Sequence, residues 1–277
     1  MNEFSIGNGL IIQTFLGDCL DVMQTIPDNS IAAIVTSPPY AQRREKNYGG
    51  IDEDQYVDWF MPIFRQMKRV LTDDGSIFIN IKPHVHRTKG RSLYVMKLVQ
   101  AIVEQEMMYF MDEFCWTKPD PYPGSFGCRL KNAWESVYHF TKRKKVKFYP
   151  QREARASAKS TMRKITNGSY LKNKWPVSQS GMSPVTRASE TALPSNHIIA
   201  SSGAQGLKRE HPAIFPLELP RFLINIWTDE GDTVLDPFAG SGTVGVACRI
   251  LHRNCILIEK HDQYYQLINR RVLIENI

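Results

Sequence analysis

Two short apolar segments near opposite ends of the chain each lead into a turn of distinctive composition. Residues 31–35 (IAAIV) precede a Ser-Pro-Pro-Tyr turn at 37–40, and residues 233–235 (TVL) precede a glycine-rich turn at 236–243 (DPFAGSGT). Apolar runs without alternation are typical of parallel strands, which are covered on both faces. Open α/β sheets bind ligands at the loops that follow such strands. The sequence therefore predicts an α/β fold whose ligand site is built from two distant loops.

Strand-like and helix-like segments alternate over most of the sequence. The alternation predicts a doubly wound, mostly parallel sheet with helices on both faces. Residues 107–116 and 134–141 are expected to be antiparallel strands around a Pro- and Gly-rich loop, and the cluster Met107–Met111 is expected to lie in the core. The other expected strands are 11–16, 31–35, 76–81, 233–236 and 255–258, and the expected helices are 19–26, 54–71, 93–104, 217–227, 244–251 and 261–274.

The net charge of +7 is concentrated in one segment. Residues 141–212 contain 15 Lys and Arg but only 3 acidic residues, which leaves the remainder of the chain acidic. A basic segment attached to an acidic body is typical of a protein that binds a polyanion such as nucleic acid. A solvated loop is the alternative, because charge runs are common. Little periodicity occurs between residues 141 and 209, which indicates an insertion or a small recognition module.

Cysteine spacing and hydropathy indicate a cytoplasmic protein. The five cysteines are odd in number and form no CxxC pair, which favours reduced thiols over a disulfide framework or a zinc site. No run of about 18 apolar residues occurs, so no membrane span is expected. Residues 1–4 lack the pattern of a secretory signal. His84 and His86 have no obvious third partner, so no metal site is expected.

The glycine-rich turn predicts a site for a small cofactor. Gly240 and Gly242 would let backbone N–H groups approach a ligand, and a helix that begins near Thr243 would direct its positive end at a carboxylate. Glu259 ends the next expected strand, where it can accept hydrogen bonds from two ribose hydroxyls. The turn is neither GxGxxG nor a P-loop, which favours a ligand with an amino-acid end and a ribose. An ordinary structural turn is the alternative.

The Ser-Pro-Pro-Tyr turn predicts a site for an amino group on a flat ring. Pro38 and Pro39 fix φ and lack N–H donors, so the Ser37 hydroxyl and the Pro38 carbonyl can accept hydrogen bonds from an exocyclic amine. Tyr40 can stack on the ring. Orientation of such an amine beside a methyl donor would supply most of the rate enhancement. A rigid kink with a packed tyrosine is the alternative.

Taken together, the two turns resemble those of the DNA amino-methyltransferases that use S-adenosylmethionine. The order of the parts is similar to the β-class enzymes of bacterial restriction–modification systems. The resemblance implies a Rossmann-like methyltransferase fold, with a catalytic part at 1–140, a basic target-recognition region at 141–210 and a cofactor-binding part at 211–277. Ser37, preceded by Thr36, resembles the cytosine-N4 members, whereas adenine-N6 members more often carry Asp or Asn at this position.

The same resemblance implies roles for individual residues. The expected catalytic residues are Ser37, Pro38, Pro39 and Tyr40. The expected cofactor-binding residues are Asp18, which would contact the adenine, with Thr36, His211, Phe215, Asp236, Pro237, Phe238, Ala239, Gly240, Ser241, Gly242, Thr243, Glu259 and Lys260. The expected DNA-binding residues are Arg43, Arg44, Arg129, Lys142, Arg143, Lys144, Arg152, Arg155, Arg163 and Lys164. The segment 118–135, with Asn132 and Glu135, resembles the family's segment near the target base.

The activity implied is methyl transfer from S-adenosylmethionine to N4 of a flipped-out cytosine in double-stranded DNA, without a metal. A cognate restriction endonuclease is a candidate partner, and the chain is expected to be a monomer or a homodimer. Methylation of adenine N6 stays open, as does a non-catalytic DNA-binding protein. Methylation of cytosine C5 is disfavoured because no cysteine follows a proline, and a nuclease because no carboxylate cluster suggests metal binding.

Overall fold

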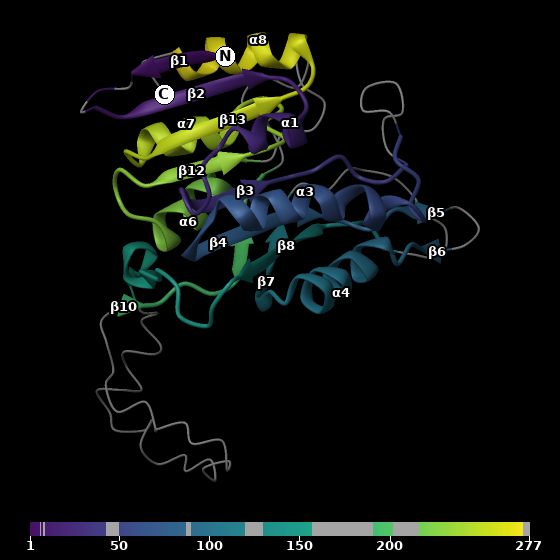
Figure 1. Ribbon diagram of the computed structural model, residues 1–277. Helices are drawn as coiled ribbons and strands as arrows, with labels where there is room; N and C mark the ends of the chain where they lie inside the picture. Colours follow the sequence, from purple (N-terminus) through teal and green to yellow (C-terminus); the bar gives the residue numbers. More distant parts are fainter. Residues whose placement is uncertain are drawn as a thin grey trace, which may run out of the picture. The chain divides into compact units, whose positions relative to one another are not determined.

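The computed structural model describes residues 1–5, 7, 9–42, 50–86, 90–119, 130–156, 191–201 and 216–273. Within these residues a mixed sheet dominates the fold (Figure 1). All of its strands point in one direction except two, β1 and β8. In spatial order the strands are β1 (Asn2–Ser5), β2 (Ile11–Leu16), β13 (Asn254–Glu259), β12 (Thr233–Asp236), β3 (Ile31–Thr36), β4 (Leu71–Ile81), β8 (Trp134–Thr141), β7 (Tyr109–Thr117) and β11 (His197–Ile199). The expected mostly parallel sheet is confirmed.

Helices cover both faces of this sheet. Successive residues of a strand point to opposite faces, so Ile34 enters one hydrophobic core while Ala33 and Val35 enter the other. The first core is completed by α1 (Cys19–Gln24), α3 (Tyr56–Val70) and α4 (Tyr94–Glu106). The second core is completed by α6 (Glu218–Trp227), α7 (Thr243–Ile250) and α8 (Asp262–Leu273). Buried apolar area on both faces is therefore the main stabilising contribution.

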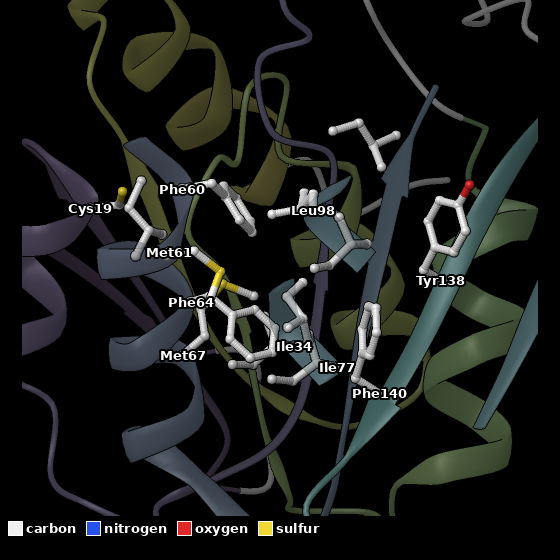
Figure 2. Close-up of a cluster of buried hydrophobic side chains, with 14 of the residues drawn as sticks. Cys19, Ile34, Phe60, Met61, Phe64, Met67, Ile77, Leu98, Tyr138 and Phe140 are labelled. Atoms are coloured by element: carbon white, nitrogen blue, oxygen red, sulfur yellow. The ribbon is translucent and has the colours of Figure 1, made fainter. Parts of the chain in front are cut away.

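The apolar face of α3 explains why this helix packs where it does. Its buried residues recur at helical spacing and form one stripe. Figure 2 shows Phe60, Phe64 and Met67 on the side of the helix that faces the strands carrying Ile34 and Ile77. This packing fixes the beginning of α3 above the carboxyl ends of β3 and β12.

The strand order reverses at the edge where the two predicted loops meet. From β12 the chain crosses to β13 on one side, and from β3 it crosses to β4 on the other. Val234 and Leu235 pair with Ala33 and Ile34, so β12 and β3 are direct neighbours. Ligands of open α/β sheets bind outside the carboxyl ends of the strands at such a reversal. The fold thus places the turns after β3 and β12 at the expected ligand crevice.

The prediction that the Met107–Met111 cluster is core is wrong for most of its residues. Met108 is buried, whereas Met107 is 82% exposed and Tyr109, Phe110 and Met111 are each at least 40% exposed. Met107 ends α4 in a left-handed conformation. The other three residues lie at the edge of the sheet, where the outer strand β11 pairs only with Cys115–Thr117 of β7. In the described part of the chain, the first half of β7 therefore has a neighbouring strand on one side alone.

The chain separates into two compact units, Met1–Tyr149 with Asn196–Ile277, and Pro150–Ser195. The second unit contains a short 3₁₀ helix at Pro150–Glu153 and an antiparallel pair, β9 (Arg155–Ala156) with β10 (Thr191–Ala192). It is narrower than the expected region 141–210, because Tyr149 bonds to Ile226 and the short β11 joins the main sheet. A small hairpin, β5 (Val85–His86) with β6 (Gly90–Arg91), belongs to the first unit. Among the described helices, none has the length and hydropathy needed to span a membrane.

Candidate active site

A buried hydrogen bond joins the two turns singled out in the sequence. Thr36, the last residue of β3, donates from its hydroxyl to Asp236 Oδ1 at 2.7 Å, and both side chains are almost fully buried. Tyr40 and Phe238, one from each turn, pack against the same hydrophobic core. The two distant segments therefore form one site, as the sequence predicts.

The first turns of α3 hold both loops. Tyr56 donates its hydroxyl hydrogen to the carbonyl oxygen of Pro39 at 2.7 Å. The ring of Phe238 lies 6.1 Å from the ring of Trp59 and 6.4 Å from that of Phe60. Because one helix contacts both turns, their separation is set by its side-chain packing.

The glycine-rich turn is shaped by glycine conformation. Gly240 and Gly242 have φ values of 52° and 77°, in the left-handed region that other residues rarely adopt. Their N–H groups do not point to a ligand as expected, since Gly240 donates to Glu259 and Gly242 donates to the carbonyl of Ala239. The glycines therefore contribute the bend of the turn, and the carboxylates of Asp236 and Glu259 are the groups best suited to ligand binding.

Glu259 is held in place by the backbone of the turn that it faces. Its Oε2 accepts from Gly240 N at 2.9 Å, and its Oε1 accepts from His261 N at 2.8 Å. Burial raises the pKa of Glu259, against the lowering effect of the backbone N–H groups around it. Each oxygen keeps a further lone pair. A ribose with two hydroxyls fits this prepositioned carboxylate.

Asp236 has one carboxylate oxygen without a partner. Oδ1 accepts from Thr36 and from Phe238 N, whereas the buried Oδ2 has no hydrogen-bond partner among the described residues. Burial raises the pKa of Asp236 to about 7, and the nearby charge of Glu259 adds to this effect. A buried acceptor without a donor is costly. An ammonium or sulfonium group of a bound cofactor would supply the missing positive partner.

Asp18 and Lys260 lie at the neighbouring strand ends. Asp18 Oδ1 caps α1 by accepting from Leu20 N at 3.0 Å, and Oδ2 accepts from Lys260 Nζ at 3.1 Å. The cap explains why the helix begins here. Both residues remain partly or largely exposed, so the pair is accessible from solvent.

The remaining expected cofactor residues of the turn are buried. Ser241 and Thr243 are buried, and their hydroxyl oxygens lie 3.2 Å apart. Arg271 of α8 donates to the Ser241 carbonyl, which fastens the turn to that helix. Pro237 and Ala239 are buried, so their side chains pack the turn. These side chains stabilise the turn from behind.

On the other side of the reversal, Ser37 and Tyr40 meet a buried amide. Tyr40 Oη lies 3.1 Å from Asn80 Oδ1, and Ser37 Oγ lies 3.5 Å from the same atom. The two hydroxyl oxygens are 3.4 Å apart. Asn80 belongs to β4, where it is a polar residue in a buried apolar strand. Sequence reasoning missed it, although that interruption of an apolar run was a visible signal.

Glu135 lies behind Tyr40 and is itself surrounded by lysines. Tyr40 donates to Glu135 Oε2 at 2.9 Å, while Lys82 and Lys118 both pair with Oε1. Burial alone would raise the pKa of Glu135, but the two lysines outweigh it and hold the pKa below its usual value. Burial and the Glu135 charge raise the pKa of Tyr40 well above its usual range. Glu135 is therefore an ionised acceptor and Tyr40 a protonated donor.

Several of the expected DNA-binding residues lie away from this site. β8 runs antiparallel, so Lys142 and Arg143 at its end leave the sheet at the edge opposite Ser37. Lys142 donates to Asn29 Oδ1 at 3.0 Å, and Arg143 pairs with Asp73. Because these two residues pair within the chain at the opposite edge, we leave them out of the proposed DNA interface.

The other expected residues fall into two groups. Lys144, Arg152 and Arg155 are exposed. Lys144 Nζ also lies 5.8 Å from the centre of the Tyr109 ring. The residues that lie outside the described part of the chain are Arg43, Arg44, Arg129, Arg163, Lys164, His211 and Phe215.

A family model described as DNA methylase, for N6 and N4 methyltransferases, matches residues 31–270. The Type II methyltransferase M.PvuII of Proteus hauseri is 26% identical over 95% of this chain and 84% of its own length. The Type II methyltransferase M.XycI of Xanthomonas campestris pv. cyanopsidis is 29% identical over 95% of this chain and 88% of its own length.

Solved structures show the same similarity. The PvuII DNA methyltransferase, described as cytosine-N4-specific, superposes with a TM-score of 0.73 at 25% identity, over 95% of this chain and 87% of that one. The fold is also that of M1.HpyAVI in its complex with SAM, with a TM-score of 0.58 at 22% identity, over 95% of this chain and 100% of that one.

Proposed function

Because this chain belongs to the DNA methylase family of N6 and N4 methyltransferases, we propose that it methylates N4 of cytosine in double-stranded DNA. The observation that carries the proposal is the joining of two loops by Thr36 and Asp236. One loop presents Asp236, which with Glu259 at the end of β13 is suited to a cofactor. The other loop presents Ser37 and Tyr40, which are suited to an amine on a planar base.

S-adenosylmethionine is the cofactor that these residues fit. Asp236 would hold a positive group with its unpaired Oδ2, and Glu259 would accept from the ribose hydroxyls. Phe238 would form an apolar wall between them. When bound, the cofactor supplies a methyl group on a positively charged sulfur, from which a nucleophilic amine can displace it. Every other task, including orientation of the amine and exclusion of water, belongs to this chain's own residues.

The Ser-Pro-Pro-Tyr turn supports transfer to an exocyclic amine. Ser37 is partly exposed at the carboxyl end of β3 and can accept an amine hydrogen. Tyr40 is only partly buried, and an aromatic ring at this position is suited to stacking on a base. Cytosine N4 is preferred over adenine N6 because Ser stands at position 37, and because M.PvuII is cytosine-N4-specific.

Double-stranded DNA is the proposed partner, and the basic residues of the segment 150–195 are its proposed contacts. Arg152 and Arg155 are exposed members of that segment. Phosphate contacts position a protein on DNA, whereas base contacts give specificity. A cognate restriction endonuclease, a cytoplasmic location, and a monomeric or homodimeric state complete the proposal.

Analysis of the methylated base tests this function. The protein is incubated with duplex DNA and labelled S-adenosylmethionine, and the DNA is digested to nucleosides for mass spectrometry. We expect N4-methylcytosine. The Ser37→Ala variant should bind the cofactor with unchanged affinity by calorimetry, yet methylate about 10- to 100-fold more slowly. N6-methyladenine as the product would replace the proposed target base, and an absence of labelled DNA would refute the function.

A further inference from the structure

The hydroxyl groups of Ser37 and Tyr40 are backed by two groups that can only accept hydrogen bonds. Glu135 Oε2 lies 2.9 Å from Tyr40 Oη, and Asn80 Oδ1 lies 3.1 Å from the same atom. Ser37 Oγ lies within 3.5 Å of both Tyr40 Oη and Asn80 Oδ1. A hydroxyl has one hydrogen and two lone pairs. The direction in which each hydrogen points therefore decides what Ser37 shows to the base.

The orientation of the Asn80 amide follows from its other contact. Asn80 Nδ2 lies 3.0 Å from the backbone carbonyl of Ser136. A carbonyl oxygen only accepts, so the NH₂ end of the amide must face it. The oxygen of Asn80 is thereby turned toward Ser37 and Tyr40, where it acts as a fixed acceptor.

The charge of Glu135 is fixed in a similar way. Both lysines, Lys82 and Lys118, contact Oε1, whereas Tyr40 contacts Oε2. The side chain of Glu135 is 6% exposed, and these lysines are mostly buried with it. Hydrogen bonds to an ionised acceptor are roughly twice as strong as those between neutral groups. The Tyr40 hydrogen thus points at Glu135.

We propose that Glu135 is a positioning residue that fixes the direction of hydrogen bonds through Tyr40, so that Ser37 presents a lone pair to the target amine. When the Tyr40 hydrogen points at Glu135, two acceptors face the Ser37 hydroxyl. These are the Tyr40 phenol oxygen and Asn80 Oδ1, and Ser37 donates its hydrogen toward them. The Ser37 hydrogen is then directed inward, and its outward lone pair accepts an amine hydrogen. This inference rests on the proposed transfer to an exocyclic amine.

The direction matters for the chemistry of the amine. If Ser37 turned its own hydrogen outward, it would donate to the nitrogen lone pair, which is the pair that attacks the methyl group. If Ser37 accepts an amine hydrogen, it leaves that lone pair free and aims it. Glu135 neither gains nor loses a proton in this role. Tyr40 and Ser37 lie between Glu135 and the proposed position of the reacting nitrogen.

A double-mutant cycle tests the proposal. Glu135→Gln, Tyr40→Phe and their combination are compared with wild type by the single-turnover methylation rate at saturating cofactor and DNA. Each single variant should be about 10- to 100-fold slower, because alignment is lost. The combined variant should be no more than about threefold slower than the slower single variant, because both changes interrupt one path. Cofactor affinity should remain unchanged in all three.

Controls separate positioning from folding. Glu113→Gln makes the same chemical change on the neighbouring strand β7, where Glu113 accepts from Ser136 Oγ, and should keep the wild-type rate. Because Glu135→Gln leaves two lysines facing one another, the cycle is repeated with Lys118→Gln, which restores the local net charge.

The outcomes are distinct from those that test the proposed function. Rate losses that multiply in the combined variant would show that Glu135 does not act through Tyr40, and a wild-type rate for Glu135→Gln would also overturn the inference. The base modified by the wild-type protein tests the proposed function separately, whatever the ratios among the variants.

Discussion

Two buried acids have opposite electrostatic settings in this site. Asp236 is 1% exposed and Glu135 is 5% exposed. The partners of Asp236 are the neutral donors Thr36 and Phe238 N, so burial dominates and raises its pKa to about 7. Burial of Glu135 is outweighed by Lys82 and Lys118, and its pKa is lowered. Two carboxyl groups of the same candidate site therefore have pKa values shifted in opposite directions by their neighbours.

The raised pKa of Asp236 predicts how stability changes with pH. Between the usual carboxyl value of 3.8 and about 7, the folded protein holds a proton that the unfolded chain has lost. The free energy of unfolding should therefore fall as pH rises through this window, by up to about 1.4 kcal/mol per pH unit from this group. Asp236→Asn removes that contribution, so the variant should gain stability relative to wild type from pH 5 to pH 8.

Urea denaturation of the ligand-free wild type and Asp236→Asn at pH 5 and pH 8 measures the difference in their free energies of unfolding. Asp21→Asn, which removes a surface charge, controls for the altered net charge. A stability difference between wild type and Asp236→Asn that stays constant with pH would contradict the assignment.

At the scale of elements, the close approach of α7 to β13 fixes the position of the glycine-rich turn. Gly245 lies in α7, and a Cβ at this position would meet Leu257 Cδ1 at 2.6 Å and Val272 Cγ2 at 3.4 Å. Leu257 is fully buried in β13. The helix can lie this close to the sheet only because position 245 has no side chain.

Gly245→Ala is therefore expected to destabilise the protein by about 1–3 kcal/mol, although alanine favours a helix. Urea denaturation gives the free energy of unfolding. The variant Leu257→Ala opens space at the same contact, so the combined variant should lose less than the sum of the two single losses. Stability equal to wild type for Gly245→Ala would show that the helix shifts without cost.

Elements with a strong local pattern were predictable from the sequence, and those that depend on a neighbour were not. The strand 134–141 and the strand 233–236 have the predicted bounds, since β-branched and aromatic residues define the first and an apolar run before a turn defines the second. The short β11 has no such pattern and is a strand only because β7 is beside it. The exposed Met107 is a further case, because its hydrophobicity does not indicate that it ends α4 in a left-handed conformation.

The site was predictable to a similar degree. The two turns could be recognised because proline and glycine restrict the backbone in ways that other residues do not. Asn80 and Lys82 could not be assigned roles, because their contacts with Tyr40 and Glu135 depend on β4 pairing with β8. Antiparallel pairing of this kind brings residues together that sequence spacing does not relate.

At the scale of the whole molecule, charge is separated between an acidic body and a basic segment. The excess of Lys and Arg lies between residues 141 and 212. Lys142 and Arg143 are nevertheless paired within the body at the edge opposite Ser37. Composition alone therefore does not show which of these charges are already paired within the protein.

The salt dependence of DNA affinity should separate the basic residues proposed to contact DNA from Lys142 and Arg143, which pair within the chain. Each phosphate contact contributes about 0.9 to the slope of log affinity against log salt. Arg163→Ala with Lys164→Ala, both outside the described residues, should reduce this slope by about 1 to 2. Lys142→Ala with Arg143→Ala should leave the slope unchanged. Fluorescence anisotropy over a salt series measures both, and an equal reduction in the two double variants would contradict the proposed interface.

The hydrogen bond between Thr36 and Asp236 spans 200 positions of the sequence, yet sheet pairing alone brings these residues together. β1 and α8, from opposite ends of the chain, also lie against each other (Figure 1). The crevice is defined by which strands pair, and this pairing is not set by the order of the two halves in the sequence. A genetic rearrangement that exchanged the order of the two halves would preserve the crevice wherever the same strands still met.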